Sequence, residues 1–136
     1  MVALADVRAV VDATAVLAAV LDEPGGERAK AAIRRRAVMS AANLAETLGK
    51  LRLKHPAVDV ADVFAIPGLQ FRPFDVQDAR RVGDLATKAP GVSLADRAAL
   101  ALAQRLRLPL VTADHEWADL DVDVVLTYFR ERKQKK

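Results

Sequence analysis

Cysteine is absent from the sequence, which excludes disulfide bridges, thiolate metal ligands and a cysteine nucleophile. Aromatic side chains are scarce too, with one Trp, one Tyr and four Phe among 136 residues. A surface that stacks nucleic-acid bases on aromatic rings is therefore not expected. Most of the 52% hydrophobic content comes from 27 Ala, 17 Leu and 17 Val. This composition favours one domain in which helices pack closely.

Long uncharged apolar runs are also missing. The longest, residues 13–21, has nine residues, whereas a membrane-spanning helix needs about 20. Asp6, Arg8 and Asp12 interrupt any apolar core of a signal peptide near the N-terminus. The sequence therefore predicts a cytoplasmic protein that makes no membrane contact.

The formal net charge of +3 is unevenly distributed along the chain. Residues 130–136 carry five Lys or Arg and one Glu, whereas residues 1–129 carry 16 basic and 17 acidic residues. We therefore predict a nearly neutral single domain over residues 1–129 and a basic C-terminal tail over residues 130–136. The net charge is weak evidence for a nucleic-acid partner, because the basic excess lies in the tail.

Short apolar stretches alternate with helical patterns along the whole chain. The predicted strands are residues 7–11, 37–40, 69–74, 109–112 and 122–126. The predicted helices are residues 13–21, 27–36, 41–53, 58–65, 76–88, 94–106 and 115–120. This alternation predicts an α/β fold, with a parallel, doubly wound sheet between two helical layers. Pro73 and Asp123 place the third and fifth strands at the edges, which gives the strand order 3-2-1-4-5.

Acidic residues follow the strands at the edge where such a sheet binds ligands. Asp12 comes directly after the first strand, and Asp114 comes after the fourth. Asp96 opens the sixth predicted helix, and Glu46 lies in the first half of the third. Each acid also has a structural explanation, a helix cap for the three aspartates and a solvated helix face for Glu46.

Four carboxylates gathered at one edge would repel one another and raise their pKa values. A divalent cation relieves that repulsion, and oxygen ligands suit Mg²⁺ or Mn²⁺. Such an ion polarises a phosphate and activates water, which is the chemistry of phosphodiester cleavage. No glycine-rich phosphate loop and no Gly-x-Ser-x-Gly motif is present. Thr14 is a candidate support for Asp12, and Asn43 becomes a candidate if its helix start borders the site.

The four acids lie in short motifs, which read VVDATA (10–15), NLAE (43–46), SLADRA (93–98) and VTAD (111–114). These motifs resemble those of PIN-domain nucleases, and especially of VapC-type toxins from toxin–antitoxin pairs. The resemblance covers residues 7–126, in the family's order and spacing. Two departures are mild: Thr14 replaces the more usual Ser, and Ala95 stands where Gly is frequent.

The resemblance implies a three-layer α/β/α PIN-like fold and a Mg²⁺- or Mn²⁺-dependent endoribonuclease that stops growth by cutting RNA of the translation machinery. The metal-binding and catalytic acids that it implies are Asp12, Glu46, Asp96 and Asp114, with Thr14 and Thr112 as polar support. Weaker candidates are Asn43, Arg97 beside a scissile phosphate, and Asp119 as an additional acid.

The resemblance also implies several partners besides the RNA substrate. A cognate antitoxin would inhibit the enzyme, and the chain would form a homodimer. Promoter DNA would be bound only indirectly, through the antitoxin.

Two other classes share part of this pattern. A receiver or phosphatase-like domain also places a Mg²⁺-binding acid after the first strand. A phosphatase of that type has a second Asp two residues later, where this chain has Thr14, and a receiver needs a further acidic pair and a late Lys that are not evident. A non-catalytic PIN-like scaffold that binds RNA or protein would have lost one of the four acids, and none is missing.

Overall fold

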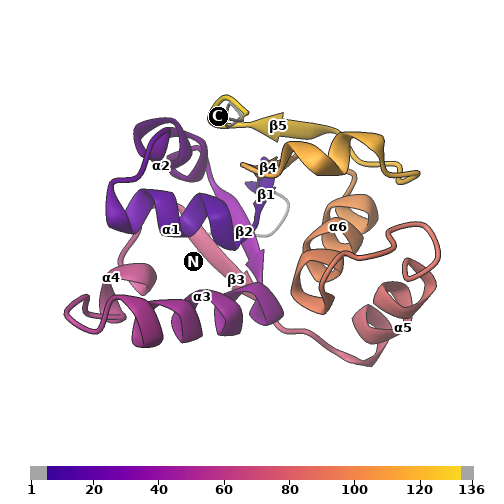
Figure 1. The fold of residues 1–136 in the computed structure, drawn as a ribbon, viewed down its shortest axis with the longest axis horizontal. Coiled ribbons are helices and arrows are strands. Elements are labelled where there is room, and N and C mark those ends of the chain that lie inside the picture. The colour runs from indigo at the N-terminus through magenta and orange to yellow at the C-terminus, as the bar shows by residue number, and fades with distance from the viewer. Residues whose placement is uncertain (1–5, 133–136) are drawn as a thin grey trace.

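Five short parallel strands form the central sheet of the computed structural model, which describes residues 6–132 (Figure 1). The strands are β1 (Ala9–Val11), β2 (Ala37–Ser40), β3 (Leu69–Arg72), β4 (Leu110–Thr112) and β5 (Leu126–Tyr128). Every neighbouring pair is parallel, and the order is β3-β2-β1-β4-β5. The predicted strand order, with the third and fifth strands at the edges, is confirmed.

Helices cover both faces of this sheet, so the fold is the predicted three-layer α/β/α arrangement (Figure 1). One layer contains α1 (Ala13–Leu21), α2 (Gly26–Arg34), α3 (Ala41–Lys54) and α4 (Ala61–Phe64). The other contains α5 (Val76–Asp84) and α6 (Leu94–Leu106), and a 3₁₀ helix, η2 (His115–Asp119), precedes β5. Within residues 6–132, none of these helices has the length and apolar character needed to cross a membrane.

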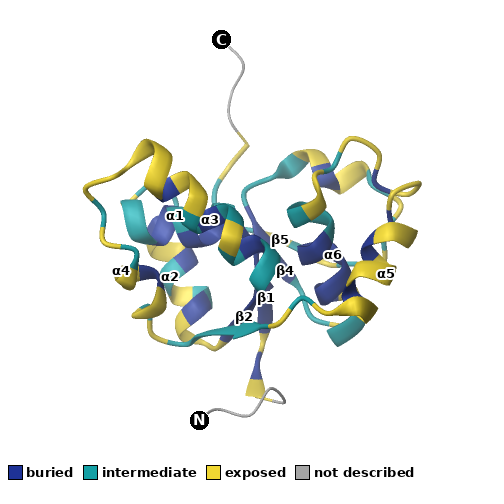
Figure 2. Cartoon of the chain, turned by 90° about the horizontal axis from the view of Figure 1, so that it is seen from below, coloured by how far each residue is buried: buried dark blue, intermediate teal, exposed yellow. Residues whose placement is uncertain are grey.

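The central strand β1 contributes to two separate cores. Val10 packs in a cluster with Leu100 of α6, whereas Val11 packs in a second cluster with Val16 of α1. Successive side chains of a strand point to opposite faces, so β1 is buried on both of them (Figure 2). Asp12 follows this strand at once and is itself 0% exposed. The burial of β1 therefore carries a carboxylate into the protein interior.

The last strand differs from its prediction. Residues 122–126 were predicted as the strand, but β5 begins at Leu126, and Asp123 lies outside it. The three residues of β4 pair with Leu126, Thr127 and Tyr128, so the ladder has no partner for an earlier start. Val122 and Val124 are half-buried against the core without joining the ladder, and this explains the apolar alternation that suggested a strand.

Helix α5 is shorter than the predicted helix over residues 76–88, and the residues that it buries against the core differ from the predicted ones. The spacing of Val76, Ala79, Val82 and Ala86 predicts one apolar stripe toward the core. This prediction is wrong except for Val82, because Val76 is 81% exposed and Ala79 and Ala86 are exposed as well. A capping box between Asp75 and Asp78 starts the helix. The buried side of α5 packs Val82 against the core, and an ion pair of 3.2 Å between Asp78 and Arg105 joins it to α6.

The described part of the predicted tail is residues 130–132, and residues 133–136 lie outside the described chain. Arg130 lies against the domain, with its guanidinium over the ring of Phe129 and 3.9 Å from the carboxylate of Glu23. The division into a domain over 1–129 and a basic tail over 130–136 stays a prediction.

Candidate functional site

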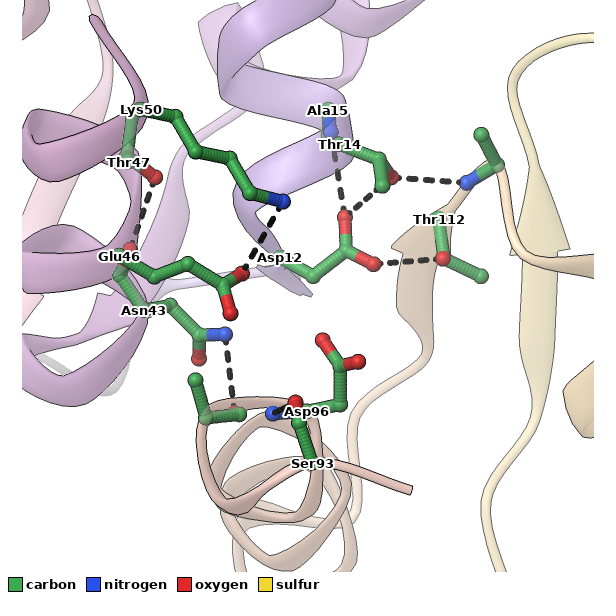
Figure 3. Close-up of polar contacts among 12 residues, drawn as sticks. Asp12, Thr14, Ala15, Asn43, Glu46, Thr47, Lys50, Ser93, Asp96 and Thr112 are labelled. Carbon is green, nitrogen blue, oxygen red and sulfur yellow. Dashed lines mark hydrogen bonds and ion pairs between the residues drawn. The ribbon is translucent and has the colours of Figure 1, made fainter. Parts of the chain in front are cut away.

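Asp12 is the best-fixed side chain at the carboxyl edge of the sheet. It is the N-cap of α1, and its Oδ1 accepts hydrogen bonds from the Thr14 hydroxyl at 2.6 Å and the Ala15 backbone N–H at 3.1 Å (Figure 3). Its Oδ2 accepts one hydrogen bond, from the Thr112 hydroxyl at 2.6 Å. A carboxylate oxygen has two lone pairs, so one lone pair of Oδ2 is still available to a further ligand.

The two threonines connect Asp12 to the turn that follows β4. The Thr14 hydroxyl accepts a hydrogen bond of 3.0 Å from the Ala113 N–H, and the Thr112 hydroxyl accepts one of 3.0 Å from the Asp114 N–H. Each hydroxyl therefore donates to the Asp12 carboxylate and accepts from the backbone beside Asp114. The predicted supporting role of Thr14 and Thr112 has a geometric basis in these contacts.

Burial raises the pKa of Asp12 from 3.8 to about 6, against the lowering effect of its three hydrogen bonds. The negative charge of Asp96 raises that pKa further. Within residues 6–132, no Lys, Arg or His forms an ion pair with Asp12. A fully buried carboxylate without a positive partner is unfavourable near neutral pH, and a bound cation would relieve it.

Asp96 is the common neighbour of the other three acids. Its negative charge raises the pKa values of Asp12, Glu46 and Asp114. The Ser93 hydroxyl caps α6 by accepting a 3.2 Å hydrogen bond from the Asp96 N–H. The helix is thus capped without the Asp96 carboxylate, which points toward the space shared with Asp12 and Glu46 (Figure 3).

Glu46 borders the same space and has a cationic neighbour that sequence reasoning missed. Burial raises the pKa of Glu46, the Lys50 ammonium lowers it, and Asp96 raises it again. The Lys50 Nζ lies 3.8 Å from Glu46 Oε1, and the two side chains are 46% and 25% exposed (Figure 3). The spacing of four residues on one helix is the signal that identifies Lys50 as a neighbour of Glu46.

Asn43 is buried rather than lying on the surface. It is 0% exposed, and its Nδ2 donates a 2.9 Å hydrogen bond to the carbonyl of Ala95, the residue before Asp96. Its Oδ1 is buried and has no hydrogen-bond partner in the described part of the chain. Asn43 therefore joins the helix that carries Glu46 to the helix that carries Asp96, and it keeps one unsatisfied oxygen.

The remaining predicted residues lie in different surroundings. Asp114 caps η2 by accepting a 3.1 Å hydrogen bond from the Glu116 N–H, and burial raises its pKa. Asp119 is exposed at the end of η2. The Arg97 guanidinium donates a 2.9 Å hydrogen bond to the Val82 carbonyl, so its structural role is to fasten α6 to α5.

Two aromatic rings stack at the β5 side of the carboxyl edge of the sheet, and sequence reasoning assigned neither of them to the site. The rings of His115 and Tyr128 stack with 3.8 Å between centroids and 11° between planes. Tyr128 pairs in register with Thr112, and its buried hydroxyl has no partner among the described residues. Burial raises the pKa of Tyr128, and the charge of Asp114 raises it further. The spacing of these residues in the sequence gives no signal of the stack.

The acids are neighbours, but they do not form a closed ligand set. In the part of the chain that the structure describes, no three His, Cys, Asp or Glu side chains are close enough together to hold a metal ion. The donors present are hard oxygens, as Mg²⁺ or Mn²⁺ requires, and Asp12 and Asn43 each have an oxygen with spare capacity. Metal binding by the four acids therefore stays a prediction that requires the less constrained side chains to rotate toward Asp12.

Comparison with known proteins identifies the class to which this fold and acidic edge belong. Residues 9–123 match the family model of the PIN domain, so the chain belongs to the PIN domain family. No curated protein is similar enough in sequence to count as a match.

Solved structures of two VapBC complexes and of a VapC toxin share the fold. DNA-bound VapBC from Salmonella typhimurium superposes with a TM-score of 0.71 at 20% identity, over 90% of this chain and 98% of that chain. VapBC2 from Rickettsia felis, bound to a promoter fragment, gives 0.69 at 14% identity, over 88% and 97%. VapC20 from Mycobacterium tuberculosis, a sarcin-ricin-loop-cleaving toxin, gives 0.68 at 13% identity, over 82% and 95%. At these identities the likeness concerns the fold.

Proposed function

We propose that this chain is a Mg²⁺- or Mn²⁺-dependent endoribonuclease and the toxin component of a toxin–antitoxin pair. The observation that carries the proposal is the Asp12 carboxylate, which is fully buried and held by three hydrogen bonds beside Asp96, and which has no positive partner among the described residues. Membership of the PIN domain family supports a nuclease, and the fold shared with VapBC complexes supports a toxin.

Asp12, Asp96, Glu46 and Asp114 would hold the ion. When bound, it would supply the positive charge that polarises a phosphodiester and lowers the pKa of a water molecule. Thr14 and Thr112 keep the Asp12 carboxylate in one orientation, so this ligand needs no reorganisation before the reaction. Lys50 adds a half-exposed positive charge beside Glu46, where it can attract a phosphate.

The proposed substrate is RNA of the translation machinery, cleaved by attack of water on a phosphodiester. The structural neighbour VapC20 from Mycobacterium tuberculosis is a sarcin-ricin-loop-cleaving toxin, and this supports RNA of the translation machinery as the substrate class. We further propose a cytoplasmic homodimer whose partner is an antitoxin, with promoter DNA bound through that antitoxin. The support for the antitoxin comes from structural neighbours that are toxin–antitoxin complexes, two of them VapBC complexes bound to DNA.

A second candidate function is a non-catalytic PIN-like scaffold that binds RNA or protein. The observation that favours it is the distance between the acids, since no three of them are placed to bind one ion in the described chain. The two candidates differ in one property, because only the nuclease requires the acids to bind a divalent cation.

Expression of the chain in a bacterial host tests the toxin proposal. The chain alone is expected to arrest growth, and co-expression of the protein encoded beside it is expected to relieve the arrest. The Asp12→Asn variant, produced at the same level, should leave growth unaffected, because the arrest depends on RNA cleavage. Normal growth of cells that accumulate soluble wild-type protein would contradict the toxin proposal.

A further inference from the structure

Four arginines line an open cavity at the edge of the sheet opposite to the acids. Arg8 immediately precedes β1, and Arg36 immediately precedes β2. Arg34 is the last residue of α2, and Arg35 is the C-cap of that helix. The cavity has a volume of about 580 Å³, and within residues 6–132 these four residues line it. We call it the arginine cavity. The acidic site, by contrast, lies where β1 and β4 end.

The backbone holds the arginines in place. The Arg8 N–H donates a 2.9 Å hydrogen bond to the Arg36 carbonyl, and the Arg36 N–H donates one of 2.8 Å to the carbonyl of the buried Ile33. Arg36 has a φ of +84°, a left-handed conformation that favours glycine and that a residue with a Cβ adopts at a cost in free energy. A long cationic side chain thus occupies a position where the backbone alone would favour glycine.

The cavity concentrates positive charge with little compensation. Among the described residues, Asp6 is the acid that forms an ion pair with these arginines. Its carboxylate lies 3.8 Å from the Arg36 guanidinium, and both side chains are about half-exposed. Arg34 and Arg35 are exposed, as is Arg8. Guanidinium groups bind phosphate through two parallel hydrogen bonds, so four of them facing one space favour a ligand with several phosphates.

The lining also indicates which polyanion fits. A protein partner would need apolar or aromatic contact area as well as charge, and the lining residues in the described part of the chain are all arginines. Base recognition by stacking would need aromatic rings, and none of the described aromatic residues lines the cavity. The remaining match is a sugar–phosphate backbone, which guanidinium groups bind without reading its sequence.

We propose that the arginine cavity binds the phosphodiester backbone of the RNA substrate outside the segment that is cut. The identification of RNA as the ligand rests on the proposed function. Arg8 and Asp12 flank the two ends of β1, which is buried on both faces, so an RNA strand that contacts both edges of the sheet has to pass around one of the helical layers.

Salt-dependent RNA binding tests this proposal. Fluorescence anisotropy with a labelled single-stranded RNA of about 20 nucleotides, in EDTA, measures binding while the acids hold no cation. The variant Arg8→Gln/Arg35→Gln is expected to make the slope of log affinity against log salt shallower by about 1.4, because two phosphate contacts are lost. The control Arg52→Gln/Arg80→Gln removes two exposed arginines from α3 and α5 and should change the slope less. If circular dichroism shows that the first variant is unfolded, Arg34→Gln/Arg35→Gln is the second test variant.

Equal slopes for the cavity and control variants would overturn the proposal, and so would wild-type protein that fails to bind the RNA in EDTA. Binding of polyglutamate as tight as binding of RNA would overturn the assignment to phosphates. The proposed catalysis is judged separately, by cleavage in Mn²⁺. If the wild-type chain binds RNA but does not cleave it, and the cavity variants lose the binding, the proposal for the arginine cavity stands and the nuclease proposal is refuted.

Discussion

The Asp12→Asn variant is expected to cleave RNA on the order of 10³-fold more slowly than the wild-type chain, or not at all. Asn keeps the shape of the side chain but removes its negative charge. It also places an amide NH₂ group where one oxygen accepts hydrogen bonds from Thr14 or Thr112. The site then loses both its buried charge and the fixed orientation of its central ligand. Single-turnover cleavage of a labelled RNA in Mn²⁺ measures the effect.

A matched control for this variant is Asp84→Asn, which removes one negative charge at the exposed end of α5. It should cleave at the wild-type rate. Addition of excess EDTA to the wild-type reaction should lower the rate as much as the Asp12 substitution does. If folded Asp12→Asn protein cleaves the RNA as fast as the wild type, Asp12 is not part of the catalytic site.

Without a divalent cation, the wild-type protein is expected to become less stable relative to Asp12→Asn as the pH rises from 4 to 7. The Asp12 pKa is about 6 in the folded chain and near 3.8 when unfolded, so the folded state binds the proton more tightly. Well below pH 3.8 the carboxyl is neutral in both states and carries no charge penalty. Between the unfolded and the folded pKa, Asp12 ionises in the unfolded chain but stays protonated in the folded chain. The difference of about two pKa units corresponds to a loss of about 3 kcal/mol in the free energy of unfolding.

Urea unfolding of both proteins in EDTA, at several pH values, measures this change. Glu46 and Asp114 also have raised pKa values, but both proteins retain them, so the difference between the two proteins isolates Asp12. Addition of Mn²⁺ at pH 7 should restore stability to the wild type only, because a ligand that binds the folded state stabilises it. A difference in unfolding free energy that does not vary with pH would show that Asp12 has an ordinary pKa.

The fold was largely predictable because the sequence pattern reports burial on both sides of a sheet. The predicted helix over 13–21 and the predicted strand over 37–40 agree with α1 and β2 at both ends. The last strand was misplaced, since three residues of β5 carry too little alternation to outweigh the apolar run before them. A strand this short is fixed by its pairing with β4, which the local sequence does not encode.

The site was predictable at the level of which segments meet, and less so for individual side chains. Asp12 and Asp114 lie at the carboxyl edge because the topology places strand ends there. The burial of Asn43 depends on the approach of α6 to α3, a long-range contact of 52 residues in sequence. The separation of the acids likewise depends on rotamers, which the motif spacing does not specify.

Isothermal titration calorimetry with Mn²⁺ at pH 7 measures whether the acids around Asp12 form a divalent-cation site. We expect saturable binding to the wild-type chain and to Asp84→Asn, and loss of that binding in Asp12→Asn and in Asp96→Asn. Folded wild-type protein that binds no Mn²⁺ would show that the acids form no such site and would favour a non-catalytic scaffold.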